Sequence, residues 1–328
     1  MSNDLIPKET GSWWSDFLKE FNLPKVIAGP AGEAISRLIA GAADIPAAYL
    51  QQVAQGVRDK TEAKTVVSKA IAETAANIAK NDPEIVKRAA HSLLSKELRN
   101  QSNKEAIAKK TLEILQEEHP KEATTEPKSV EADWMNVFEK FAGDASSERM
   151  QEMWARVLAG EIRKPGAFSL QTLRFIAELN QETARLFEKF ATAVINADFI
   201  PFPPRRGAEF TELLRLQEFG LVTGVSGSLN KAFSISAPMQ LLTYRRHALI
   251  VVLEPPAEFN ISSVLLTNVG REIYNILKID DDIERAKEFA NEFPKVKVTR
   301  ILYMKTDNTD GAGPQIELWK KEEPPATN

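Results

Sequence analysis

The sequence predicts a mainly α-helical protein, with helical N-terminal and central regions and a small α+β, winged-helix-like module at the C-terminal end. Two patterns predict this class: apolar residues recur at helical spacing through most of the first 200 residues, and short β-type runs occur only after them. The length of 328 residues and the hydrophobic fraction of 43% allow several domains, each with its own core. We predict four parts: a helical N-terminal region with long amphipathic helices (1–118), a linker (119–131), a compact helical motif domain (132–200) and the α+β module (201–328).

The N-terminal region begins with a short amphipathic helix, Trp13 to Phe21, and a second helix begins at Gly29-Pro30. Asp44-Ile45-Pro46 interrupts that run. The pattern is again helical from Pro46 to about Ala79, and Asp82-Pro83 marks the beginning of a helix that runs towards Glu117. Prolines, threonines and many charges between His119 and Glu131 predict the linker.

The central part is predicted to hold compact helices that each begin at a residue able to accept a hydrogen bond from an unpaired backbone N–H. These helices are Asp133 to Ala142, Ser146 to Ile162, Ser169 to Leu179 and Asn180 to Ile195.

Prolines between residues 201 and 204 mark the hinge before the α+β module. The pattern there predicts a helix from Phe210 to Phe219 and two more from Asn268 to Leu277 and Asp282 to Phe293. Its predicted strands are Phe233 to Ser236, Ala248 to Glu254, Val296 to Met304 and Ile316 to Trp319.

Composition removes several classes of chemistry. The absence of cysteine excludes disulfides, thiolate metal sites and cysteine nucleophiles, and it suits the cytoplasm. The N-terminal residues lack the basic start and apolar run of a secretory signal, which also favours a cytoplasmic protein. His91, His119 and His247 are far apart in the sequence, and phosphate-binding glycine motifs are missing. We therefore predict no cofactor, no metal site and no conventional enzyme activity.

Weak motif matches have simpler explanations. Ser228 and Lys231 satisfy Ser-x-x-Lys, but neighbouring glycines favour a turn. The aspartates at 280–282 are better helix caps than cation ligands, and Asp307 to Gly311 fits a hairpin turn better than a calcium loop.

Residues 26–43 form a segment dense in glycine and alanine, a composition that allows helices to approach closely in bundles and in membranes. Glu33 and Arg37 lie four residues apart and are able to pair. Asp44 and Pro46 end the run before the roughly 20 apolar residues that a membrane span requires. An ordinary bundle-core helix is the favoured interpretation; the alternative is a helix that meets a membrane or another subunit after release.

The helix, hairpin and helix order of the C-terminal module is typical of a winged helix. A nucleic-acid interface would use Arg205, Arg206, Arg245 and Arg246 as phosphate contacts. However, residues 201–328 hold 16 basic and 17 acidic side chains, so electrostatic attraction for nucleic acid is small. A protein-contacting or structural module is therefore favoured, and nucleic acid is a possible but not a favoured partner.

Residues 154–173 carry a specific motif, W-x-R-x-L-A-G-E-I-x-x-P-G-x-F-S-L-x-T-L, which resembles the bacterial domain-of-unknown-function 2806 family. Its apolar members predict a buried helical stripe, Pro165-Gly166 ends the helix, and Ser169 caps the next. The motif residues that we single out as a site of unknown function are Trp154, Arg156, Gly160, Glu161, Pro165, Gly166 and Ser169. For Arg156 and Glu161 two interpretations stay open: an ion pair or capping bond that fixes the corner, or a ligand contact.

More loosely, the small-residue helix near Gly29, the later helices and the C-terminal end are similar to abortive-infection alpha proteins of phage defence. The resemblance implies an effector or regulator that acts by protein interaction, oligomerisation or conditional membrane association. The alternative function is a winged-helix-like regulator that binds nucleic acid.

Overall fold

The computed structural model describes residues 30–40, 83–117, 129–227, 229–244, 247–279, 283–305 and 315–321. The chain divides into two compact units, Met1–Leu173 and Arg174–Asn328. The division falls within helix α7 (Leu170–Glu178). The four-part division at residues 118, 131 and 200 stays a prediction.

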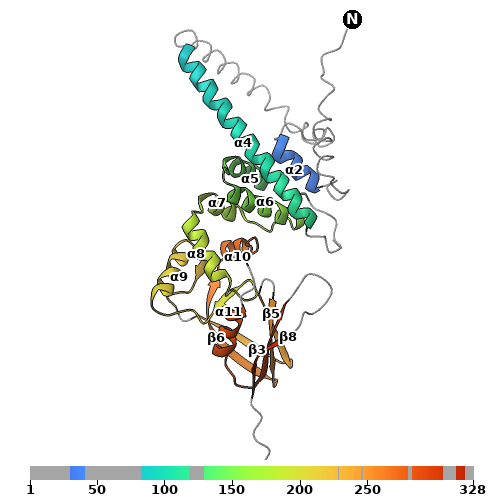
Figure 1. The fold of residues 1–328 in the computed structure, drawn as a ribbon, viewed down its shortest axis with the longest axis vertical. Coiled ribbons are helices and arrows are strands. Elements are labelled where there is room, and N and C mark those ends of the chain that lie inside the picture. The colour runs from blue at the N-terminus through green and yellow to red at the C-terminus, as the bar shows by residue number, and fades with distance from the viewer. Residues whose placement is uncertain are drawn as a thin grey trace, which may run out of the picture. The chain divides into compact units, whose positions relative to one another are not determined.

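The described part of the first unit is helical (Figure 1). Its long helix α4 packs against α2, α5 and α6, and its residues Ile107, Ala108 and Leu112 are fully buried there. α4 begins at Pro83, in agreement with the predicted Asp82-Pro83 start. The helices before α7 are α2 (Pro30–Ala40), α4 (Pro83–Glu117), α5 (Ala132–Asp144) and α6 (Glu148–Arg163).

The prediction of a mainly α-helical protein is wrong. The described residues of the second unit contain two antiparallel sheets of four strands each, so the fold is α+β. The first sheet has the order β1-β6-β2 with β3 also paired to β6, and the second has the order β4-β5-β7-β8. The strands are β1 (Phe199–Pro201), β2 (Val222–Thr223), β3 (Asn230–Ile235), β4 (Met239–Thr243), β5 (His247–Leu253), β6 (Ala257–Leu266), β7 (Val298–Lys305) and β8 (Gln315–Lys320).

The strands that the sequence did not predict explain this error. β6 contains Asn260, Ser262 and Ser263, residues with low strand propensity, yet it pairs with β1, β2 and β3. Strand β4 pairs with β5, the next strand along the chain, and the sequence predicted only β5 of this pair. The winged-helix-like description is therefore also wrong, because the strands of this region build two sheets rather than one small hairpin beside helices.

An apolar core of the second unit lies between strands of both sheets and helix α11 (Ile283–Glu292). Val251 of β5 lies opposite Ile301 of β7, and both are fully buried. Phe259 of β6 and Phe289 of α11 belong to the same core. The remaining helices of this unit are α8 (Gln181–Ala191), α9 (Ala208–Glu218) and α10 (Asn268–Tyr274).

Two of these helices begin at side chains that accept backbone hydrogen bonds. The Asn180 Oδ1 accepts from the Thr183 backbone N–H at 2.8 Å at the start of α8. The Thr267 Oγ1 accepts from the Gly270 N–H at 3.0 Å at the start of α10. Such caps are the reason that the sequence located these helices to within a few residues.

No helix among the described residues combines the length and the apolar character that crossing a bilayer requires. The cytoplasmic localisation stays a prediction.

Replacement of Gly270 by alanine should destabilise the second unit. An added Cβ would lie 2.1 Å from the carbonyl oxygen of Leu221, and backbone atoms cannot move aside as a flexible side chain can. We expect Gly270→Ala to lower the free energy of unfolding by about 2–3 kcal/mol. The matched control is Gly227→Ala, whose added Cβ would meet the Gly224 carbonyl oxygen at an ordinary 3.6 Å.

Hydrogen exchange of the β5 and β6 amides in the full chain measures this effect. Equal protection of the two alanine variants would contradict the proposed close approach.

Candidate interaction site

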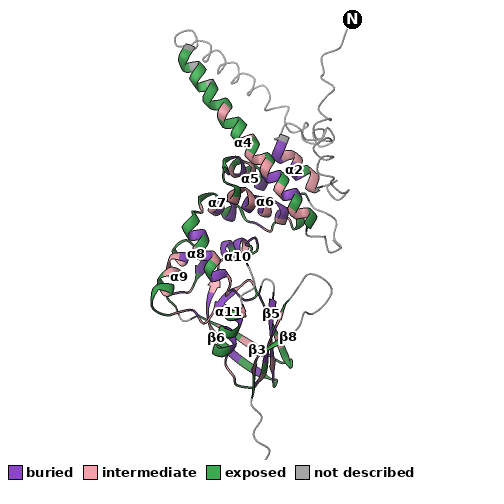
Figure 2. Cartoon of the chain, viewed as in Figure 1, coloured by how far each residue is buried: buried purple, intermediate pink, exposed green. Residues whose placement is uncertain are grey.

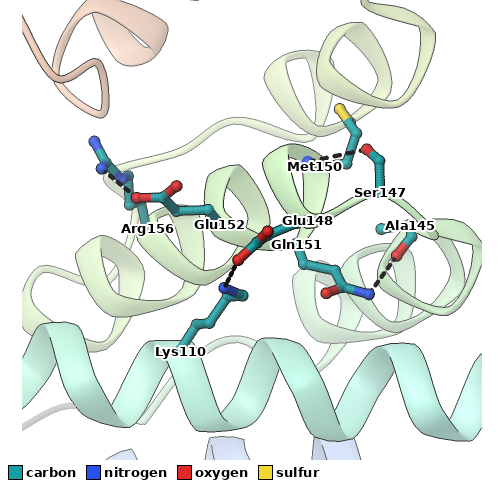
Figure 3. Close-up of polar contacts among 8 residues, drawn as sticks. All are labelled: Lys110, Ala145, Ser147, Glu148, Met150, Gln151, Glu152 and Arg156. Atoms are coloured by element: carbon teal, nitrogen blue, oxygen red, sulfur yellow. Dashed lines mark hydrogen bonds and ion pairs between the residues drawn. The ribbon is translucent and has the colours of Figure 1, made fainter.

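The motif residues begin on helix α6. The Ser147 Oγ accepts a hydrogen bond from the Met150 backbone N–H at 3.3 Å and so caps the helix one residue after the predicted Ser146 (Figure 3). Met153, Trp154, Val157 and Leu158 are buried, which gives the apolar stripe that the sequence predicted. The helix ends at Arg163, directly before Lys164-Pro165-Gly166.

Trp154 lies in an aromatic cluster contributed by α5 and α6. The residue is 1% exposed, and its ring lies 5.4 Å from the ring of Phe138 and 6.1 Å from that of Phe141, measured between centroids. Trp134 stacks on Phe138 at 5.1 Å. The Trp134 indole Nε1–H donates to the carbonyl oxygen of Phe168 at 2.8 Å, which ties α5 to the loop after α6.

Glu161 closes the corner between α6 and α7. Its side chain is buried, its Oε1 accepts from the Gly166 N–H at 2.6 Å, and its Oε2 accepts from the Phe168 N–H at 3.0 Å. A buried carboxylate needs such donors, because its desolvation is otherwise strongly unfavourable. Of the two interpretations left open above, the capping bond describes this geometry.

Gly160 and Gly166 are required by the same corner. A Cβ on Gly160 would lie 2.7 Å from Cε2 of Phe168, so the glycine allows that ring to pack against α6. Gly166 has a φ of +85°, a backbone region in which glycine is favoured. The Ser169 Oγ then accepts from the Thr172 N–H at 3.3 Å and caps α7, as predicted.

Arg156 pairs with Glu152 one turn earlier on α6, with 2.8 Å between Nη2 and Oε1 (Figure 3). The Arg156 side chain is 15% exposed and that of Glu152 is 40% exposed. An ion pair within one helix at partial exposure contributes little to stability, roughly 0.3–0.5 kcal/mol.

Polar contacts fix α6 against α4 along their shared side. Lys110 and Glu148 form an ion pair at 3.3 Å (Figure 3). The Thr111 Oγ1 donates to Ile107 O at 2.8 Å and approaches Ala155 O at 3.4 Å. Thr111 is fully buried, and these two carbonyl oxygens provide hydrogen-bond partners for its hydroxyl group.

Helix α2 docks on the same bundle through a buried apolar face of Ala34, Ile35, Leu38 and Ile39. Helix α2 is the described part of the glycine- and alanine-rich segment 26–43. The favoured interpretation, an ordinary bundle-core helix, describes the position of α2 in this structure.

The polar contacts of α2 run mainly through Arg37. Its Nε lies 2.8 Å from Glu139 Oε1, and its Nη2 donates to Asn136 Oδ1 at 2.5 Å and to Ala132 O at 3.2 Å. Arg37 thus pairs with Glu139 on α5 rather than with Glu33. At the end of α2, the Gln101 amide Nε2 donates to Ile39 O at 2.9 Å.

Residues 87–199 match the model of a family described as a protein of unknown function, DUF2806. Over this stretch the chain is similar to that family. The predicted resemblance is thus confirmed, and the region extends from α4 to the start of β1. No curated protein and no solved structure matches the chain. The looser resemblance to abortive-infection alpha proteins stays a prediction.

Of the four predicted nucleic-acid contacts, the structure describes Arg205 and Arg206, and their role stays a prediction. Arg205 donates to Gly227 O and to the Ser262 Oγ, which places it against the loop after β2 and strand β6. Arg206 is exposed. Arg245 and Arg246 lie outside the described residues.

Of the weak motif matches and the histidines, the structure describes only Lys231, His91 and His247. Lys231 pairs with Asp198 at 2.6 Å, whereas Ser228, residues 280–282 and residues 307–311 lie outside the described residues. His91 is exposed on α4, His247 is buried between the rings of Tyr244 and Tyr303, and His119 is not described. Among the residues that the structure describes, no group of three or more histidines and carboxylates has a geometry that would hold a metal.

The contacts that sequence reasoning missed are those of Trp134 with Phe168 and of Arg37 with Glu139. These partners lie 34 and 102 residues apart. The motif includes Phe168, but nothing in the motif indicates that the Phe168 carbonyl oxygen accepts a hydrogen bond from Trp134.

Replacing Glu161 should loosen the corner in a graded way. Glu161→Ala removes the acceptors of the Gly166 N–H and of the buried Phe168 N–H, and we expect a loss of about 2–4 kcal/mol in unfolding free energy. Glu161→Gln keeps one acceptor oxygen and should lose about half as much. Glu152→Gln, at the exposed end of the neighbouring pair, is the control and should change stability by less than ~0.5 kcal/mol.

Denaturant unfolding followed by tryptophan fluorescence measures these differences. Equal stability of Glu161→Ala and Glu152→Gln would show that the corner does not depend on this carboxylate.

Proposed function

We propose that this chain is a non-enzymatic bacterial protein that acts by interaction and assembly, as an effector or regulator similar to abortive-infection factors. In this account α2 is a releasable helix: a partner or a phage signal detaches it from the bundle. The released surfaces then bind a protein partner or further copies of the chain, or α2 meets a membrane. The proposal predicts no bound cofactor and no catalytic turnover.

The docking of α2 is the observation that carries this proposal. Four apolar side chains of α2 are buried, and detachment would expose both these residues and the face of the bundle that they cover. Newly exposed contiguous apolar surface is typical of protein or membrane interaction sites. Detachment therefore creates the kind of surface on which assembly depends.

The size of α2 supports release as a separate step. A helix of 11 residues is too short to be stable alone in water, so α2 needs either this bundle or another apolar surface to remain helical. If α2 leaves the bundle and binds another apolar surface, it can therefore remain helical.

The ion pair between Arg37 and Glu139 is the contact to test. Both side chains are less than one fifth exposed, so a carboxylate opposite Glu139 would be poorly solvated. We expect Arg37→Glu to weaken docking by roughly 1–3 kcal/mol, which raises the released fraction about 5- to 150-fold. The charge-swapped double variant, Arg37→Glu with Glu139→Arg, should restore most of the docking.

The measurement combines sedimentation velocity, dye leakage from vesicles and bacterial growth for the wild type, Arg37→Glu and the double variant. We expect Arg37→Glu alone to form oligomers or to release dye, and to arrest growth. Oligomers without leakage would assign the function to protein assembly, and leakage would assign it to the membrane. The proposal fails if Arg37→Glu exposes α2 to hydrogen exchange yet stays monomeric, releases no dye and allows normal growth.

A further inference from the structure

The N-terminal half of α4 presents a row of exposed leucines. Leu93, Leu94 and Leu98 are 63%, 61% and 63% exposed, whereas Ile107 and Leu112 in the other half of the same helix are fully buried. Figure 2 shows this change along α4, with exposed residues over the half that begins at Pro83. We call Leu93, Leu94 and Leu98 the leucine stripe.

The leucine stripe lies on the face of α4 that is buried further along. Each of its residues precedes a buried residue by fourteen positions: Leu93 precedes Ile107, Leu94 precedes Ala108, and Leu98 precedes Leu112. Fourteen residues are close to four turns at about 3.6 residues per turn. The apolar face of α4 that packs on α2, α5 and α6 therefore continues into the N-terminal half of α4 as the leucine stripe. There no described residue covers it.

The chain between α2 and α4 begins and ends at the two limits of this uncovered face. At one limit the Ile39 carbonyl, at the end of α2, accepts from Gln101 of α4 at 2.9 Å. At the other limit the chain enters α4 at Pro83. The connecting residues 41–82 lie outside the described residues, and the leucine stripe lies on α4 between Pro83 and Gln101.

We propose that residues 62–79 of the same chain dock on the leucine stripe, antiparallel to α4. The sequence pattern predicts a helix through this stretch, with Val67, Ile71, Ala75 and Ile78 at helical spacing. Eighteen helical residues span about 27 Å, the length of the stretch of α4 between Pro83 and residue 100.

The connection and the apolar spacing favour the same arrangement. Only Lys80, Asn81 and Asp82 separate the two stretches, and short connections join antiparallel helices. In this pairing Ile78 lies near Ile85, and Ile71 lies near Leu93 and Leu94. In this arrangement residues 62–79 bury the leucine stripe. The competing occupants are a second copy of the chain and an acidic lipid surface.

Cysteine cross-linking tests this proposal without background, because the natural chain has no cysteine. The test pair is Ile71→Cys with Leu94→Cys. The matched control is Ile71→Cys with Ser92→Cys, since Ser92 is exposed at the same level of α4 but about 160° around the helix from Leu94. Under mild oxidation of the full chain, we expect an intrachain disulfide in the test pair at least tenfold faster than in the control.

The products identify the occupant of the stripe. Intrachain disulfide confined to the test pair supports the proposal. Predominantly interchain disulfide would assign the stripe to a second copy, and equal rates in both pairs would also overturn the proposal. A further measurement uses vesicles of anionic phospholipid: wild-type binding that is lost in Leu94→Glu would assign the stripe to a lipid surface instead.

This proposal does not depend on the release of α2, because the cross-link is formed in the resting protein with α2 docked. Its failure would leave the proposed function unaffected, and failure of the vesicle and growth tests on Arg37→Glu would leave the cross-link result unaffected.

Discussion

The burial of one face of α4 is the interaction on which the first unit depends. Ile107, Ala108 and Leu112 form the common floor against which α2, α5 and α6 pack. Burial of this apolar area provides most of the stabilisation, and directional contacts from Thr111 to Ala155 of α6 and from Gln101 to Ile39 of α2 help to select the positions of those helices. The docked position of α2 is therefore set by α4 together with α5, through Arg37.

The DUF2806 motif specifies a helical corner. Trp154 fills the interior between α5 and α6, Gly160 makes room for Phe168, and Glu161 holds the loop by two backbone hydrogen bonds. These functions require a tryptophan, a glycine and a carboxylate at those positions, since neither a larger residue at 160 nor a shorter one at 161 would preserve the contacts. Trp154, Gly160 and Glu161 thus each have a structural explanation within this corner.

The sequence predicted those parts of the fold that depend on local contacts. Helices α6 and α10 begin at Ser147 and Thr267, whose side chains accept hydrogen bonds from residues three positions later. Glu161 was singled out from the motif, and its partners lie only five and seven residues away. In both cases the interacting groups are close in the sequence. Residue type and spacing predicted the helix caps, whereas the contact of Glu161 was left open between an ion pair or capping bond and a ligand contact.

Contacts between distant segments account for the errors. The strand β6 is interrupted by polar residues and is defined by its pairing with β1, β2 and β3, so its own sequence indicated it weakly. The partner of Arg37 could not be predicted either. Glu33 was the nearest carboxylate in the sequence, but the bundle brings Glu139 of α5 to the guanidinium.

The central claim is that α2 is a docked helix that detaches on its own from an otherwise folded bundle. Native-state hydrogen exchange at increasing denaturant measures this directly, by comparing the amides of residues 30–40 with those of α6. The account predicts that α2 opens at a clearly lower free energy, and with a smaller denaturant dependence, than α6. Identical opening free energies and denaturant dependences for the two helices would contradict it, because α2 would then leave only when the whole bundle unfolds.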